Sequence, residues 1–169
     1  MKPKHVTPEK EQLIRECLRY EGGHLYWRVN RRGGVKAGDV AGNTRLNGYI
    51  ETRVGGNVFL VHRIVFFLHY GYWPEYIDHI NRDRADNRVE NLRECTVGQN
   101  QYNSAKRPNT KFGRNIDWNS NQNKYVVRIQ VKGRRLLCGY FDDLELAELV
   151  ASEAREKYHG EYAYKETNE

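Results

Sequence analysis

The segment YIDHINRDRADNRVENLRECTVGQN, residues 76–100, decides the expected fold of the chain. Tyr76–His79 has the length and composition of a short strand, and the Asn-, Asp- and Arg-rich stretch that follows, up to Arg88, is expected to be a loop. Val89–Thr96 returns to apolar residues, and Thr96 has the residue type that caps a helix N-terminus. The segment therefore predicts a strand, a polar loop, a second apolar stretch and a helix that contains Asn100.

Four residues of this segment carry hydrolytic chemistry. Asp78 and His79 are adjacent, Asn91 follows His79 by 12 positions, and Asn100 follows Asn91 by nine. Breaking a phosphodiester needs an activated water, neutralisation of charge on the phosphorus oxygens and help for the leaving oxygen. An imidazole supplies the first, and the oxygen ligands of Asp78 and Asn100 suit Mg²⁺ or Mn²⁺. Because neighbouring strand residues point to opposite sides, a bend must bring Asp78 and His79 to one phosphate.

The segment and its surroundings resemble the HNH (ββα-metal) nucleases, in the subtype found in phage and homing endonucleases. Val61-His-Arg63 and Asp86–Leu92 look like the flanking signature of that subtype, and the resemblance covers about residues 37–105. It implies a ββα-metal core, with His79 as general base and Asn91 as the residue that orients it.

The same resemblance implies that Asp78 and Asn100 are the protein ligands of one Mg²⁺ or Mn²⁺ ion per active site. Many relatives have His in place of Asn100, and an amide oxygen is a weaker ligand, so low metal affinity is expected. Gln99, Gln101 and Asn103 lie close enough in sequence that the ligand position stays open. His62 is expected to have a structural hydrogen-bonding role, and Arg93 either contacts phosphate or is a surface charge.

The residues before this segment predict a helix and a small sheet. Thr7-Pro8-Glu9 predicts a helix start, and the apolar spacing that follows continues to Leu18 and stops at Gly22-Gly23. Three alternating segments then predict strands, and a buried helix follows. The expected strands and helix are His24–Val29, Gly48–Val54, Val58–Val61 and Arg63–Tyr70. The pair Gly33-Gly34 after two arginines is either a turn or a phosphate cradle.

The C-terminal third predicts a separate small module of three strands and a helix. Tyr125–Val131 alternates strictly, Lys132-Gly133 has turn composition, and Arg134–Phe141 forms another strand. A helix is expected from Asp143 to about Tyr158, capped by Asp142 or Asp143. Its apolar stripe is predicted to consist of Leu146, Leu149, Val150, Ala154 and Tyr158.

Charge points to a polyanionic partner. The net charge is +6 and the pI about 9.2. Residues 104–141 hold nine Lys or Arg against one acid, whereas residues 142–169 hold three against nine. One element is therefore expected to face phosphates and another to turn away, although any exposed sheet can be basic.

The module resembles the AP2 DNA-binding domain over about residues 112–165. The matching segments are Phe112–Trp118, Tyr125–Arg128, Gly139–Asp142 and the helix around Ala147–Ala154. Such domains lay a sheet in the major groove of double-stranded DNA, so that outward residues contact it. With Arg93 of the nuclease part, the candidate DNA-binding residues are Arg114, Trp118, Arg128, Gln130, Lys132 and Arg134.

Composition favours two small domains over one large one. Hydrophobic residues make up 38% of the chain, which fills a single large core poorly. The expected division is a nuclease domain at 1–104 with its motif core at about 58–104, a linker at 105–111, and a DNA-binding domain at 112–169. The expected class is α+β.

Composition also bounds the cellular context. Cys17, Cys95 and Cys138 are isolated thiols without a C-x-x-C pair, so no disulfide framework or zinc site is signalled and a cytoplasmic location is expected. The longest apolar run, Ile64–Leu68, is far too short for a membrane span, and the N-terminus lacks a signal-peptide core.

The sequence thus predicts a site-specific, homing-type DNA endonuclease that acts as a monomer or weak dimer without a small-molecule cofactor. A single HNH centre implies one cut per bound chain. Two other functions stay open: a DNA-binding regulator with a decayed nuclease centre, and a binder of structured RNA.

Overall fold

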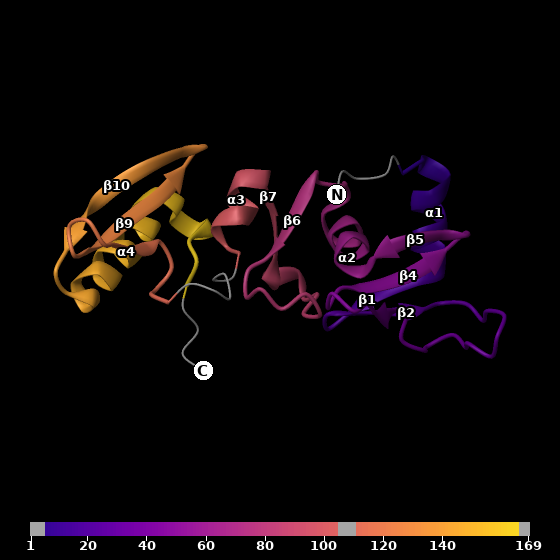
Figure 1. Cartoon of the computed structure of the whole chain (residues 1–169). Coiled ribbons are helices and arrows are strands. Elements are labelled where there is room, and N and C mark those ends of the chain that lie inside the picture. The colour runs from indigo at the N-terminus through magenta and orange to yellow at the C-terminus, as the bar shows by residue number, and fades with distance from the viewer. Residues whose placement is uncertain (1–5, 105–110, 166–169) are drawn as a thin grey trace. The chain divides into compact units, whose positions relative to one another are not determined.

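A computed structural model describes residues 6–104 and 111–165 (Figure 1). The chain divides into two compact units, residues 1–96 and 97–169. The boundary between the units lies eight residues before the end of the nuclease domain expected from sequence, at residue 104. The predicted linker lies outside the described residues except for Lys111.

The first unit begins with a short helix and a hairpin. Helix α1 spans Pro8–Cys17, and the chain passes directly into strand β1, Leu18–Glu21, which pairs antiparallel with β2, His24–Trp27. The helix predicted to continue to Gly22-Gly23 therefore ends four residues earlier. Gly22 and Gly23 have φ of +55° and +88° and form the turn of the hairpin, which requires a left-handed backbone that glycine adopts without strain.

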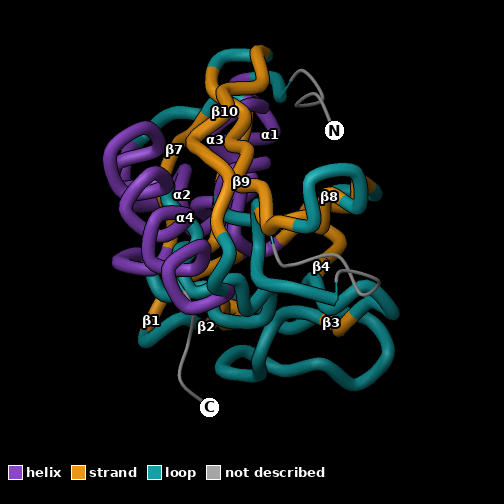
Figure 2. Tube along the Cα trace, turned by 60° about the vertical axis from the view of Figure 1, so that its left-hand side comes forward, coloured by secondary structure: helices purple, strands orange, loops and turns teal. Residues whose placement is uncertain are grey.

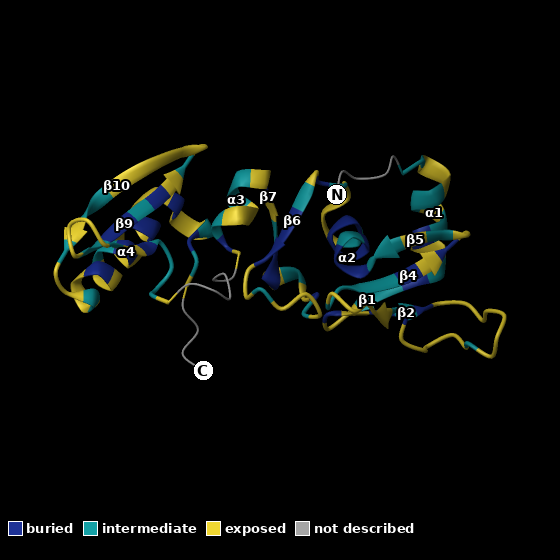
Figure 3. Ribbon diagram, in the orientation of Figure 1, coloured by how far each residue is buried: buried dark blue, intermediate teal, exposed yellow. Residues whose placement is uncertain are grey.

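A three-stranded sheet and a buried helix follow. Strands β3 (Asn43–Thr44), β4 (Ile50–Val54) and β5 (Asn57–Leu60) pair in that order, and residues 28–42 before them are mostly loop and turn (Figure 2). Helix α2, Val61–Tyr70, starts directly at Val61, which was expected to end the preceding strand. It is buried along most of its length (Figure 3) and ends at Gly71, whose φ is +84°.

Helix α2 is the centre of the first core. Ile64, Val65, Phe66 and Phe67 are each at most 3% exposed, and they pack with Ile14, Leu18 and Leu25 from the N-terminal elements. Burial of such side chains contributes about 1.5–3 kcal/mol each. Because Ile77 and Leu92 belong to the same cluster, the core also holds the strand pair that carries Asp78 and His79.

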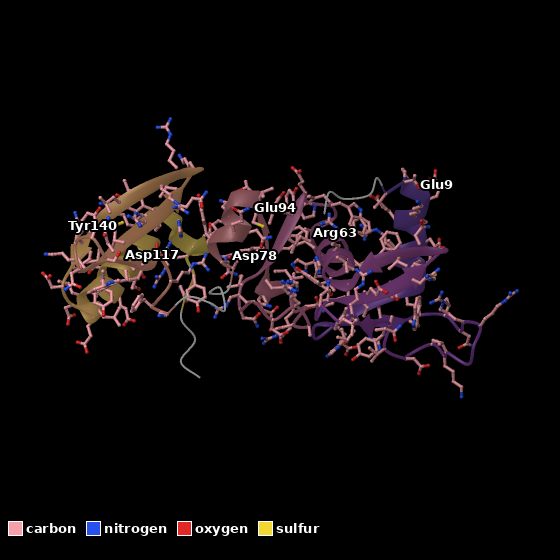
Figure 4. The ribbon with its side chains drawn as sticks, in the orientation of Figure 1. Glu9, Arg63, Asp78, Glu94, Asp117 and Tyr140 are labelled. Carbon is pink, nitrogen blue, oxygen red and sulfur yellow. The ribbon has the colours of Figure 1, made fainter. Side chains whose placement is uncertain are left out.

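That strand pair consists of β6 (Tyr76–His79) and β7 (Leu92–Cys95), which are antiparallel. A polar loop and a short 3₁₀ helix, η1 (Val89–Asn91), connect them. Arg63 of α2 donates to the carbonyl oxygens of Pro74, at 2.5 Å, and Glu75, at 3.5 Å (Figure 4). These bonds attach the helix to the chain immediately before β6 and so fix where β6 begins.

The second unit contains helix α3, Val97–Tyr102, and a three-stranded sheet covered by a longer helix. The strands are β8 (Ile116–Asn119), β9 (Lys124–Val131) and β10 (Arg134–Phe141), in the spatial order β10-β9-β8, and helix α4 spans Leu144–His159. A short 3₁₀ helix, η2 (Gly160–Tyr162), follows α4. The predicted module of three strands and one helix is present, and Asp143 is its cap, because its carboxylate accepts from the Leu146 amide at 2.8 Å.

The predicted apolar stripe of α4 is wrong in most of its positions. Ala147 and Ala151 are buried against the sheet, and of the predicted positions Ala154 is buried and Val150 packs against the same core, whereas Leu146, Leu149 and Tyr158 are 48%, 55% and 40% exposed. Ala147 and Ala151 pack against Ile116 and Val127 of the sheet. Small side chains are needed there because they allow the helix to approach the strands closely, so the larger leucines are left on the outer face.

The two units together are a mixed architecture of small antiparallel sheets and helices, compatible with the predicted α+β class. Within residues 6–104 and 111–165, no helix is both long and apolar enough to cross a membrane.

Candidate active site

The loop between β6 and β7 is closed by the side chain of Asn91. Its Oδ1 accepts from the Asn81 amide at 2.9 Å, while its Nδ2 donates to Asn81 Oδ1 and to the Asp86 carbonyl, at 2.9 and 2.8 Å. The Ile80 amide donates to the Asn91 carbonyl at 2.9 Å. Asn91 is 7% exposed, so each of these bonds forms away from bulk water. Asn91 therefore fixes the backbone that immediately follows His79.

The imidazole of His79, the residue just before this loop, is 5% exposed. Its Nε2 lies 3.3 Å from Oδ1 of Asn87, which is itself 1% exposed. The side chain next to the ring is thus Asn87, whereas the resemblance implies an orienting role for Asn91. Burial lowers the pKa of His79, and the hydrogen bond to Asn87 and the nearby carboxylates oppose that shift only in part. The ring is therefore neutral at neutral pH, as a general base must be.

Two more rings pack around His79. The centroid of His62 lies 5.0 Å away in an edge-on arrangement, and that of Tyr49 lies 5.9 Å away. Burial holds the pKa of His62 well below its usual range, and the neighbouring His79 and Arg63 lower it further. The predicted hydrogen-bonding role of His62 is not seen at Nδ1, which is buried and has no hydrogen-bond partner. His62 and Tyr49 thus pack their rings against that of His79.

Asp78 forms a nearly buried ion pair with Arg93. The register of β6 and β7 places the two residues opposite each other, and Arg93 Nη2 and Nε donate to Asp78 Oδ2 at 2.7 and 3.0 Å. Their side chains are 7% and 13% exposed. Arg93, expected to contact DNA or to be a surface charge, thus has the candidate metal ligand as a partner (Figure 4 labels Asp78).

The other candidate ligand, Asn100, is an exposed residue of α3 and belongs to the second unit. Of the alternative positions, Asn103 is buried, at 4% exposure. Among the described residues there is no group of three or more His, Cys, Asp or Glu that could hold a metal. The available donors are the carboxylate of Asp78 and side-chain amides, and such hard oxygen donors fit Mg²⁺ or Mn²⁺ with water and phosphate in the remaining positions.

The candidate DNA-binding residues of the second unit do not share one face. Arg128 and Gln130 alternate on β9 with Val127 and Ile129, which are buried on the side covered by α4, so both lie on the outer face. Trp118 pairs with Tyr125 and Arg134 with Val131, which places both on the helix-covered side of the sheet. Lys132 lies in the turn with φ of +48°, outside the strand alternation.

Arg114 occupies a different position again, outside the sheet. Its Nη2 donates to the Gln101 carbonyl at 3.0 Å and to Ser104 Oγ at 3.4 Å. Arg114 therefore links the segment before β8 to the end of α3.

The sheet register adds outer-face residues that were not predicted. Arg135 lies opposite Gln130, Leu137 opposite Arg128, and Tyr140 opposite Val126, and all three are exposed. Asp117 lies on the same face and pairs with Arg128 at 3.8 Å (Figure 4 labels Asp117 and Tyr140). The Lys132-Gly133 turn in the sequence could have predicted the position of Arg135. Counting outward from a two-residue turn pairs Val131 with Arg134 and Gln130 with Arg135.

Residues 59–102, from the end of β5 to the end of α3, match the model of the HNH endonuclease family. Searches of curated proteins and of solved structures give no match. The family match supports an HNH nuclease, a hydrolase whose substrate is DNA, at the segment that contains Asp78, His79, Asn91 and Asn100.

Proposed function

We propose that this chain is a site-specific, metal-dependent DNA endonuclease of the homing type. The observation that carries the proposal is a buried, neutral His79 next to the buried carboxylate of Asp78, in a loop closed by Asn91, inside the segment that matches the HNH endonuclease family. Burying polar groups is costly unless each has a partner, and buried groups with a shifted pKa are typical of functional sites.

In this mechanism His79 takes a proton from the attacking water. The neutral ring provides the lone pair, and its pKa, lowered by burial, keeps it unprotonated near neutral pH. Asn91 orients His79 through the backbone, because it fixes the amides of Ile80 and Asn81 directly after it. Asp78 and Asn100 would hold one Mg²⁺ or Mn²⁺ ion, which when bound stabilises charge on the scissile phosphate and the leaving oxygen.

The second unit is proposed to be an AP2-like module that selects the site on double-stranded DNA. Arg128, Gln130 and Arg135 lie on the outer face of its sheet, and the Glu side chains of α4 are exposed on the other side of the unit. A basic sheet face suits phosphate and base contacts, whereas the acidic helix is repelled by the duplex. A chain with one such centre makes one cut per binding event, as a monomer or weak dimer.

The direct test is cleavage of supercoiled plasmid with Mg²⁺ and with chelator, by the wild type and by His79→Ala. Cleavage should require the metal and fall by about 10²–10⁴-fold in the variant, while DNA affinity stays nearly unchanged. Near-wild-type cleavage by His79→Ala would remove His79 from the mechanism. DNA binding without any metal-stimulated cleavage by the wild type would favour a regulator with a decayed centre.

A further inference from the structure

We propose that Asn87 is a positioning residue that sets the tautomer of His79, so that Nε2 carries the proton and Nδ1 is the basic nitrogen. The structural part of this inference stands on the geometry around the ring. Its catalytic consequence rests on the function proposed above, in which His79 is the general base.

Asn87 is held in a defined orientation by the loop. Its Nδ2 donates to the Ala85 carbonyl at 3.0 Å, and the Ala85 amide in turn donates to Asp83 Oδ1 at 2.9 Å. The side chain is almost completely buried, so bulk water does not compete for its amide. Rotating the amide by half a turn would place Oδ1 against the Ala85 carbonyl, two acceptors together, and would leave that carbonyl without its donor. The orientation with Oδ1 directed at His79 is therefore strongly favoured.

An amide oxygen accepts hydrogen bonds and donates none. Since Oδ1 lies 3.3 Å from His79 Nε2, the favourable arrangement has a hydrogen on Nε2. A neutral imidazole has one N–H and one lone pair, so the lone pair is then on Nδ1. In the other tautomer two lone pairs would face each other in a buried site, where the cost is greatest.

Neighbouring groups restrict rotation of the His79 ring away from Asn87. His62 and Tyr49 pack against it, and the carbonyl of His79 accepts from the Arg82 amide at 2.9 Å. The two asparagines therefore have different roles. Asn91 fixes the backbone after His79, and Asn87 holds the proton of the ring on Nε2.

The test is ¹⁵N NMR of the histidine rings in the full-length protein, without metal, at a pH where His79 is neutral. The Nδ1 and Nε2 shifts distinguish the two tautomers directly. The wild type should show Nε2–H, because the amide oxygen of Asn87 accepts from that nitrogen. Asn87→Leu should move towards the mixture of tautomers seen in a free imidazole. Asn81→Leu is the matched control, because it removes the hydrogen bonds that the Asn81 side chain makes with Asn91 and Asp86 without removing the acceptor at the ring.

The inference fails if Asn87→Leu keeps the wild-type tautomer, or if the wild type carries its proton on Nδ1. Cleavage supplies the second measurement. Asn87→Leu should reduce kcat at least in proportion to the fraction of the Nε2–H tautomer that is lost, with KM for DNA unchanged. If the tautomer shifts as expected and kcat does not change, the inference about Asn87 stands and the assignment of His79 as general base is wrong.

Discussion

Asp78 and Arg93 form an ion pair in which neither side chain is more than 13% exposed. Replacing Arg93 with Met should leave a carboxylate with little access to water, and we expect the free energy of unfolding to fall by up to about 3–5 kcal/mol. Urea unfolding at low ionic strength measures this. Arg88→Met is the matched control, since Arg88 pairs with Asp86 at the surface and its loss should cost much less. If both variants lose the same free energy of unfolding, the ion pair of Asp78 contributes no more to stability than a surface pair.

His62 should make the fold sensitive to acid. Because burial holds the pKa of its folded state well below the usual value of about 6.5, the unfolded chain takes up a proton first as pH falls. The stabilising effect of the neutral ring is complete above pH 6.5 and is lost as pH drops below it. Unfolding free energies between pH 8 and 5 should therefore decline less steeply in His62→Gln than in the wild type. Parallel profiles would contradict this role.

At the scale of elements, helix α3 depends on the rest of the second unit. It has six residues, none of them buried, and so cannot be stable alone. Tyr102 stacks on His159 with ring centroids 3.8 Å apart and planes 5° apart, and its hydroxyl accepts from the Lys132 amide at 3.0 Å. The helix that carries Asn100 is therefore held by α4 and by the turn between β9 and β10.

Tyr102→Ala should loosen α3 without unfolding the sheet. An aromatic pair contributes about 0.5–1.5 kcal/mol, so hydrogen exchange of the α3 amides should accelerate by about two- to tenfold. Tyr158→Ala, on the exposed side of the end of α4, is the control and should leave those amides unchanged. Unaltered exchange of α3 in Tyr102→Ala would mean that the stack does not hold the helix.

For the whole molecule, the separation of charge in the second unit predicts which surface meets DNA. Arg135→Ala, on the outer face of the sheet, should weaken binding and reduce the slope of log affinity against log salt by about one if it contacts phosphate. Lys157→Ala removes an equal charge from α4 and should change neither quantity. The measurement is binding of full-length protein to duplex DNA over a range of salt. A larger effect from Lys157 would assign binding to the helix side.

The sequence predicted most of the elements that position the site. Alternation located β9, local composition located β6, the Lys132-Gly133 turn located the start of β10, and the pair Asp142-Asp143 located a helix start, because periodicity, turn composition and capping act within a few residues. It failed where a neighbour in space decides the outcome. The buried face of α4 is lined by alanines because of the sheet beneath it, and no property of the helix alone distinguishes that face from the leucines beside it.

The sequence alone determined which functional groups are present: an Asp-His pair, two asparagines at defined spacing and a basic C-terminal module. Residue types and their spacing can be read directly from the chain. Only the tertiary structure decided how those groups are paired. Strand register set Arg93 against Asp78, and the folding of the loop set Asn87 rather than Asn91 against the His79 ring. These hydrogen bonds and ion pairs join atoms that are separated along the chain. Which atoms become partners is therefore set only when the backbone has folded and brought them within bonding distance.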